Sequence, residues 1–115
     1  MMTNERRQAI ESQIVRAILT KAKKSGFEIL LNNGEEIIPL NPFKTVTRML
    51  AECKSVDEES ITLIDPANGK RRSIHLVYGN TGFDVICDYN TNLHDWLADI
   101  NDMAERIAMK MGARG

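Results

Sequence analysis

Three consecutive segments in the second half of the chain alternate apolar and polar residues with a period of two. They are Ser60–Asp65, Arg71–Tyr78 and Phe83–Tyr89. Such alternation is typical of half-buried β-strands, and short glycine-containing turns, Pro66–Gly69 and Gly79–Gly82, join the segments. We therefore expect an antiparallel three-stranded meander, which constrains the fold more than any other feature of the sequence.

Two long amphipathic helices are expected at the two ends of the chain. The first spans about residues 4–25 and is capped by Thr3 or Asn4, because a side-chain oxygen there can accept a free first-turn N–H. The last is capped by Thr91 or Asn92 and ends near Gly112. Its apolar stripe is Trp96, Ile100, Met103 and Ile107.

The region between the first helix and the meander predicts a hairpin and a short helix. Residues 26–31 and 35–40 are expected to be strands joined at Asn33-Gly34, a pair that accepts the positive φ of a tight turn. Pro39 cannot donate to a ladder, which indicates an edge strand. Asn41-Pro42 is typical of a helix start.

The predicted order is α-β-β-α-β-β-β-α, which indicates a single α+β domain over residues 1–115. We expect two layers, with a mainly antiparallel sheet of up to five strands and helices packed on one face. A chain of 115 residues, 43% of them hydrophobic, can bury a core of this kind without disulfides or metals.

The last hairpin predicts which side chains share a face. If Gly79 pairs with Gly82, a core face forms from three facing pairs. These pairs are Tyr78–Phe83, Leu76–Val85 and Ile74–Cys87. The opposite face would carry His75, Val77, Asp84, Ile86 and Asp88. Contiguous apolar residues rimmed by charge are typical of interaction sites, so this face is the candidate partner surface; a solvated sheet surface is the alternative.

A zinc site is not expected. Cys53, His75, Cys87 and His94 contain no CxxC or HxxxH pair, whereas structural zinc sites draw ligands from short local pairs. Cys53 and Cys87 fall on predicted core positions and behave there as small hydrophobes. No metal or other cofactor is expected.

No catalytic constellation is expected either. Asp84 and Asp88 would lie about 13 Å apart along one strand, too far for two carboxylates that act on one bond. His75 near Asp84 could form a base and its orienting group, but the sequence places no Ser, Cys or second acid beside them as a nucleophile.

The charge and hydropathy of the chain indicate which kind of partner it can bind and in which cellular compartment it is expected. The formal charge is −1 at pH 7 and the pI is about 6.1, which argues against a dedicated nucleic-acid binder. Residues 1–25 are nevertheless basic and residues 84–106 acidic, so the first helix could contact nucleic acid, or the two helices could attract one another within the fold or between copies. No apolar run is long enough to span a membrane, and charged residues at the N-terminus replace the apolar stretch of a signal peptide, so we expect a cytoplasmic protein.

The segment Leu76–Asn90, LVYGNTGFDVICDYN, resembles small uncharacterised proteins from bacteriophage, prophage and other mobile-element regions of proteobacteria. Those proteins carry an LVYGNxGxDVIxDYxxN-type segment and an acidic final helix. They also share a pattern matched here by Ser25–Ile29 and Gly34–Glu36. The resemblance implies a small accessory product of a phage or integrated element in a bacterial cytoplasm and transfers no activity.

The function expected from the sequence is therefore a non-enzymatic protein-binding module, with a host or phage protein as partner or with itself as a homodimer. Its surface would be the sheet face described above or the acidic face of the final helix, where Asp95, Asp99 and Asp102 lie at helical spacing. The alternative is a nucleic-acid-associated regulator that uses the basic first helix. An uncharacterised enzyme is the third possibility.

Overall fold

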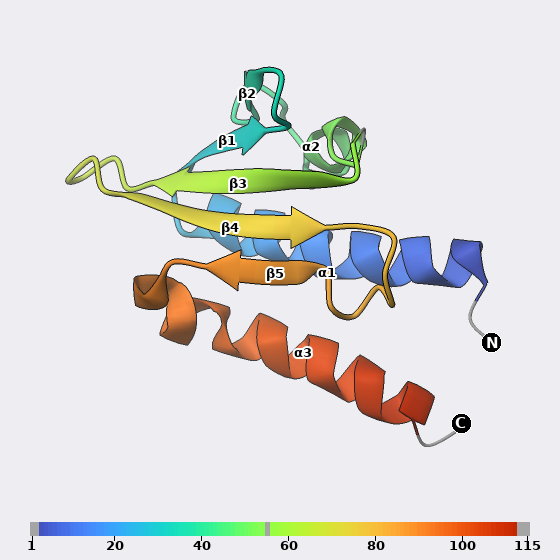
Figure 1. Cartoon of the computed structure of the whole chain (residues 1–115). Helices are drawn as coiled ribbons and strands as arrows, with labels where there is room; N and C mark the ends of the chain where they lie inside the picture. Colours follow the sequence, from blue (N-terminus) through green and yellow to red (C-terminus); the bar gives the residue numbers. More distant parts are fainter. Residues whose placement is uncertain (1–2, 55, 113–115) are drawn as a thin grey trace.

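The structure, a computed structural model, describes residues 3–54 and 56–112. Within them the chain forms a five-stranded antiparallel sheet of order β2-β1-β3-β4-β5, with the helices on one side (Figure 1). The elements are α1 (Asn4–Lys24), β1 (Glu28–Asn32), β2 (Ile37–Pro39), α2 (Val46–Glu52), β3 (Glu58–Ile64), β4 (Arg71–Val77), β5 (Ile86–Tyr89), the 3-10 turn η1 (Thr91–Leu93) and α3 (His94–Gly112). This confirms the predicted α+β class and element order.

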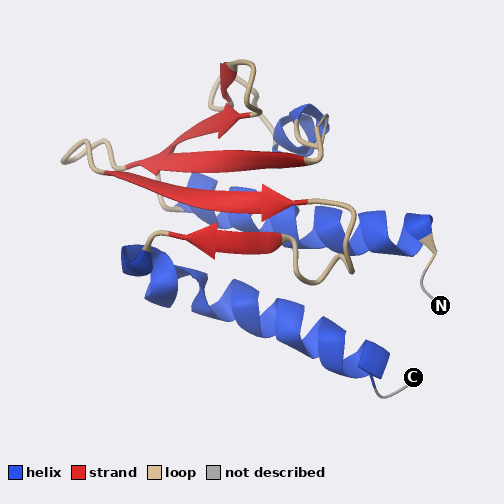
Figure 2. Ribbon diagram, viewed as in Figure 1, coloured by secondary structure: helices blue, strands red, loops and turns tan. Residues whose placement is uncertain are grey.

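Helix α1 begins and ends as its sequence predicts. The Thr3 hydroxyl accepts the N–H of Arg6 at 3.1 Å and so caps the first turn. At the other end Gly26 adopts a φ of +77°, which turns the chain out of the helix and toward β1. The helix lies against one face of the sheet and runs roughly along the direction of the strands (Figure 2).

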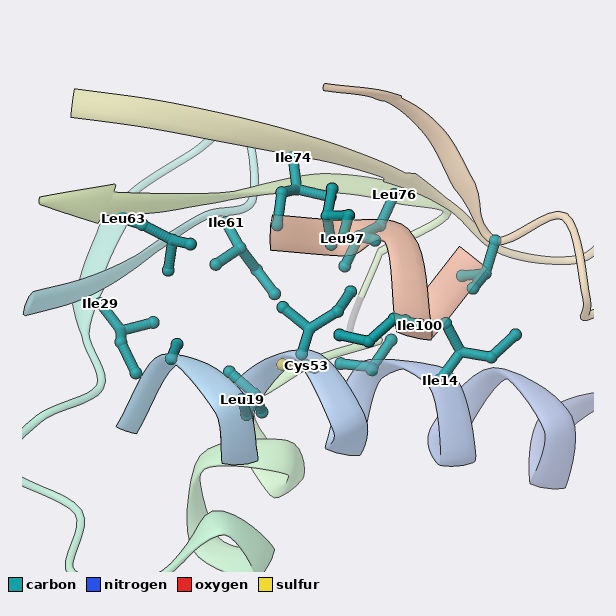
Figure 3. Packing of buried hydrophobic residues seen from close by; sticks show 14 of the residues in the cluster. Ile14, Leu19, Ile29, Cys53, Ile61, Leu63, Ile74, Leu76, Leu97 and Ile100 are labelled. Carbon is teal, nitrogen blue, oxygen red and sulfur yellow. The ribbon is translucent and has the colours of Figure 1, made fainter. Parts of the chain in front are cut away.

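The core lies between the sheet and the helices (Figure 3). On β1, β3 and β4 every second side chain points to the helices, as the period of two requires. The sheet contributes Ile29, Leu31, Ile61, Leu63, Ile74 and Leu76, all essentially inaccessible. The helices contribute Ile14, Ile18, Leu19, Leu97 and Ile100. Removal of this apolar surface from water is the main term that stabilises the fold.

Helix α2 starts later than predicted. The Asn41 side chain accepts the N–H of Ile29 at 2.6 Å and donates to the carbonyl of Phe27 at 3.2 Å. It therefore fastens the start of β1 instead of capping a helix, and Thr45 caps α2 by accepting the N–H of Arg48 at 3.2 Å. The predicted start at Asn41-Pro42 is wrong because a tertiary contact takes the capping side chain.

The predicted register of the last hairpin is wrong. The observed partners are Ile74 with Tyr89, His75 with Asp88, and Leu76 with Ile86, with a bulge between the last two pairs. The bulge leaves Cys87 exposed, although a core position was predicted for it. Strand β5 starts only at Ile86, because the residues before it form a turn in which the N–H of Val85 donates to the carbonyl of Gly82.

That turn lies against α1. A Cβ on Gly82 would be 3.0 Å from the carbonyl oxygen of Arg7 and 3.2 Å from Cβ of Ile10. Gly82 also has a φ of +91°. Contact with the helix therefore sets the path of the turn, and this displaces the strand that follows it.

Candidate functional site

The five residues predicted as a partner surface do not share one face. His75 and Val77 lie on the sheet face opposite the helices, which we call the open face, and Asp88 lies beside His75. Ile86 instead pairs with Leu76 and packs against the core, so its predicted outward position is wrong. Asp84 lies in the turn before β5, where its carboxylate accepts the N–H of Thr81 at 3.2 Å.

The open face carries a polar row that the sequence reasoning missed. Ser60 lies opposite His75, and its hydroxyl is 3.2 Å from Nδ1 of that ring. The predicted absence of a hydroxyl beside His75 is therefore wrong. The register between β3 and β4 was the missing information, because the parity of each strand alone does not say which residues lie opposite one another.

The polar row borders a small cavity. The cavity beside it, lined by His75 and Asp88 among others, has a volume of about 180 Å³. Ligand pockets have volumes of about 300–1,000 Å³. Thr62 and Ser73, one row further along, are hydrogen-bonded to each other at 3.2 Å. The hydroxyls of the open face thus bond mainly within the sheet.

A second polar group is buried beneath the end of the sheet. Glu11 and Glu59 are each only 2% exposed. Glu11 accepts the N–H of Gly79 at 2.8 Å, and Glu59 accepts the N–H of Lys54 at 2.9 Å and the hydroxyl of Tyr78 at 2.5 Å. The two carboxylates therefore tie α1, the turn after α2, β3 and the end of β4 together.

Burial changes the acidity of the groups in this cluster. Desolvation raises the pKa of the Cys53 thiol to about 12. Desolvation and the hydrogen bond to Glu59 also raise the pKa of Tyr78. Both groups are therefore neutral near pH 7, and a thiol in this state is a poor nucleophile.

The cluster borders a cavity of about 460 Å³, and most of its polar groups bond to one another; one Glu59 oxygen and Nε of Arg7 have no hydrogen-bond partner among the described residues. Lys54 donates to the hydroxyl of Ser12 at 2.6 Å and to the carbonyl of Gln8 at 3.3 Å. Nε of Arg7 lies 3.8 Å from the Glu11 carboxylate. This pattern is that of a structural clamp. A sequence signal for it existed, since Glu59 continues the inward parity of the β3 core residues.

The cysteines and histidines that the structure describes lie apart from one another and do not form a set of metal ligands. Cys53 is buried near Met49, whose carbonyl accepts its thiol at 3.6 Å, and Cys87 is exposed. His94 bonds to the Tyr89 hydroxyl at 2.9 Å. Within residues 3–54 and 56–112 no three His, Cys, Asp or Glu side chains come together as metal ligands. In the same stretch of chain no helix has the length and hydropathy to cross a membrane.

The basic first helix and the acidic last helix attract one another within the fold. Lys21 donates to the Asp99 carboxylate at 2.8 Å and to the carbonyl of Trp96, and its ammonium lies 5.0 Å from the centre of the indole ring. The hydrogen bond from Lys21 lowers the pKa of Asp99. Further along, the Gln13 amide lies 3.9 Å from the sulfur of Met103. These contacts align the two helices antiparallel (Figure 1).

Two adjoining cavities follow the line between these helices and form what we call the α1–α3 groove. Their volumes are about 510 and 310 Å³, and Gln13 lines both. Apolar side chains from both helices form much of the lining: Ala9, Ile10, Ala17, Ile100, Met103 and Ile107. Basic side chains lie around it: Arg6, Arg16, Lys21, Lys24 and Lys110.

The charge of the groove is unbalanced. Asp99 is its acidic lining residue, and it is already paired with Lys21. In the part of the chain that the structure describes, no carboxylate forms an ion pair with Arg6, Arg16 or Lys24. The groove therefore combines an apolar floor with a cationic rim.

Comparison of the chain with known protein families, curated proteins and solved structures gave no match.

Proposed function

We propose that this protein is a non-enzymatic binding module that holds an acidic amphipathic helix of a protein partner along the α1–α3 groove. In line with the resemblance of Leu76–Asn90, we place it among small accessory products of phage or integrated elements that act in the bacterial cytoplasm.

The feature that carries this proposal is the combination of an apolar floor and an uncompensated cationic rim in one groove between two helices. An amphipathic helix binds such a groove by inserting apolar side chains at helical spacing. Acidic side chains on its flanks would then meet Arg6, Arg16 and Lys24.

The open face supports this function less well. Its centre carries hydroxyl and imidazole groups, and these are hydrogen-bonded across the strands. The large exposed hydrophobics among the described residues are Ile37, at the start of β2, and Met109, on α3. A contiguous apolar patch is the usual mark of a binding surface, and it is found in the groove rather than on the open face.

Nucleic acid is the less favoured ligand of the same helix. Four of the six cations of α1 have partners within the fold: Arg7 with Glu11, Arg16 with the Thr47 hydroxyl, Lys21 with Asp99, and Lys23 with the carbonyl of Lys44. Most of the cationic side chains of this helix are therefore already held by contacts within the molecule. A phosphate-binding surface depends on clustered free cations and a net positive field.

The single tryptophan offers a direct test. Trp96 lies beneath the Lys21 ammonium at the end of the groove, so its fluorescence should change when the groove is filled. The probe is a synthetic helical peptide of about five turns with leucines on one face and glutamates on the other. We expect saturable binding that weakens as salt is added, because the rim contacts are screened.

Matched variants locate the site. Arg16→Glu and Lys24→Glu should each weaken peptide binding about threefold to tenfold. Lys70→Glu makes the same charge change in the exposed turn between β3 and β4 and should leave binding unchanged. A peptide with lysine in place of glutamate should not bind. Equal loss in all three variants, or retardation of a DNA duplex without peptide binding, would overturn the proposal.

A further inference from the structure

We infer that the protein is a homodimer joined through its helical layer, in which the outward face of α1 in each copy packs on the outward face of α3 in the other. The apolar face of α3 is buried in its own chain, so this contact goes beyond the proposed function and does not fill the groove. Two exposed stripes, one on each helix, carry it.

Both stripes repeat at alternating steps of three and four residues, the spacing that places side chains along one line of a helix. The α1 stripe is Arg6, Ala9, Gln13, Arg16 and Thr20, and all five residues are exposed. The α3 stripe is Asp95, Ala98, Asp102, Glu105 and Met109, also all exposed. The first stripe is cationic and the second is anionic.

The two helices also differ in net charge over their whole length, α1 being basic and α3 acidic. Helix α1 carries six basic and two acidic side chains, whereas α3 carries four acidic and two basic ones. If two copies met with α1 on α1, like charges would face each other. Placing α1 of each copy on α3 of the other brings opposite charges together, and a two-fold axis parallel to the helices does this twice.

The same axis fixes the register, because rotation about it leaves each residue at its own level along the helices. Within one chain Gln13 lies level with Met103, and Lys21 lies level with Asp99. Arg16 falls between these two levels, so it would face Asp102 of the second copy. Its guanidinium donates to the Thr47 hydroxyl at 3.2 Å in the single chain and would turn from that bond to the carboxylate. Ala9 by the same alignment faces Met109.

The pairing of Ala9 with Met109 explains why a large apolar side chain is exposed on α3. Met109 is 67% exposed in the single chain, although methionine contributes well when it is buried at an interface. A small alanine opposite it gives the thioether room to pack. Each contact between α1 of one copy and α3 of the other would thus join one apolar pair to one ion pair.

The test is a charge exchange read by sedimentation equilibrium at concentrations up to about 100 µM. The unmodified chain should dimerise at low salt and dissociate in about 1 M NaCl, where the screening length is about 3 Å. Arg16→Glu and Asp102→Lys should each raise the dimer dissociation constant about tenfold or more, because each change turns two attractions into repulsions.

Mixing the two variants is the decisive step. In a mixed pair the glutamate introduced in one copy would face the lysine introduced in the other, and the unmodified Arg16 and Asp102 would face each other. A heterodimer should therefore form at about the affinity of the unmodified protein. Lys70→Glu and Glu35→Lys, both in exposed turns, serve as the control pair and should neither weaken the dimer nor favour mixing.

Failure of this inference can be told apart from failure of the proposed function. A chain that stays monomeric, or a dimer that mixing does not restore, overturns the homodimer. If the acidic peptide still binds the groove in a rim-dependent way, the binding function stands with a different protein as partner. If neither the second copy nor the peptide binds, both proposals fall.

Discussion

The Glu59 carboxylate depends heavily on its neighbours, because it is almost wholly removed from water. One of its oxygens accepts from Tyr78 and Lys54, and the other has no hydrogen-bond partner among the described residues. Tyr78→Phe removes the stronger donor and should lower the free energy of unfolding by about 1.5–3 kcal/mol, as expected for a hydrogen bond to a charged group.

Urea unfolding followed by circular dichroism measures this loss. Tyr89→Phe is the matched control. It removes an exposed hydroxyl that contacts His94 and should change stability by less than about 0.5 kcal/mol. Equal effects of the two substitutions would contradict the role assigned to Glu59.

The two cysteines should differ in their reaction with a thiol reagent. Cys87 is exposed at the bulge, whereas Cys53 is buried and the pKa of its thiol is raised to about 12. Native protein should release chromophore from one thiol quickly, and the second should react only after urea is added. Replacement by Cys87→Ser should abolish the rapid phase. A rapid phase from Cys53, or none at all, would contradict the observed register.

At the scale of elements, the contact between the β4–β5 turn and α1 can be tested at one glycine. Gly82→Ala faces both a positive φ and a close backbone oxygen, whereas Gly34→Ala has nearly the same φ, +92°, and open space around it. We expect Gly34→Ala to lower the free energy of unfolding by about 1–2 kcal/mol. Gly82→Ala should lower it by about 1–3 kcal/mol more.

Thermal or urea unfolding of the two variants gives the difference directly. It isolates the steric cost, because the backbone penalty is shared. If the two substitutions destabilise equally, the turn does not press against α1, and the displaced start of β5 needs another cause.

The elements that local chemistry determines could be predicted from the sequence. The Thr3 cap, the glycine after α1 and the edge position of Pro39 were all confirmed. The start of α2 and the last register were wrong, because the Asn41 side chain and the Gly82 turn are each held by segments distant in sequence. Local patterns carry no information about such contacts.

The candidate site was harder to predict for the same reason. The period of two placed His75 and Val77 correctly, but the bulge moved Ile86 to the other side of the sheet. The groove depends on how two helices from opposite ends of the chain pack together. Their opposite charges predicted attraction, and Lys21 with Asp99 shows it within the fold, yet no spacing in the sequence shows a cavity between them.

For the whole molecule, the buried cluster predicts a loss of stability at alkaline pH. Cys53 has a pKa of about 12 in the folded protein against 9.0 in a free thiol, and burial also raises the pKa of Tyr78. As pH rises above about 9, the unfolded chain releases these protons before the native state does. The free energy of unfolding therefore falls, approaching about 1.4 kcal/mol per pH unit for each group that ionises.

Urea midpoints measured near neutral pH and at about pH 10 test this slope. The double variant Cys53→Ala with Tyr78→Phe starts from a lower stability but should lose less of it between the two pH values. A wild-type midpoint that does not fall above about pH 9 would contradict the shifted ionisation.

The two edge strands have a consequence for how the protein behaves at high concentration. Strand β2 has only three residues, and Pro39 offers no N–H; on β5 the Tyr89 N–H is occupied by the Asp88 carboxylate. Neither margin gives an incoming strand a continuous row of donors. Fibrillar stacking through the edges of the sheet is thereby disfavoured from both sides.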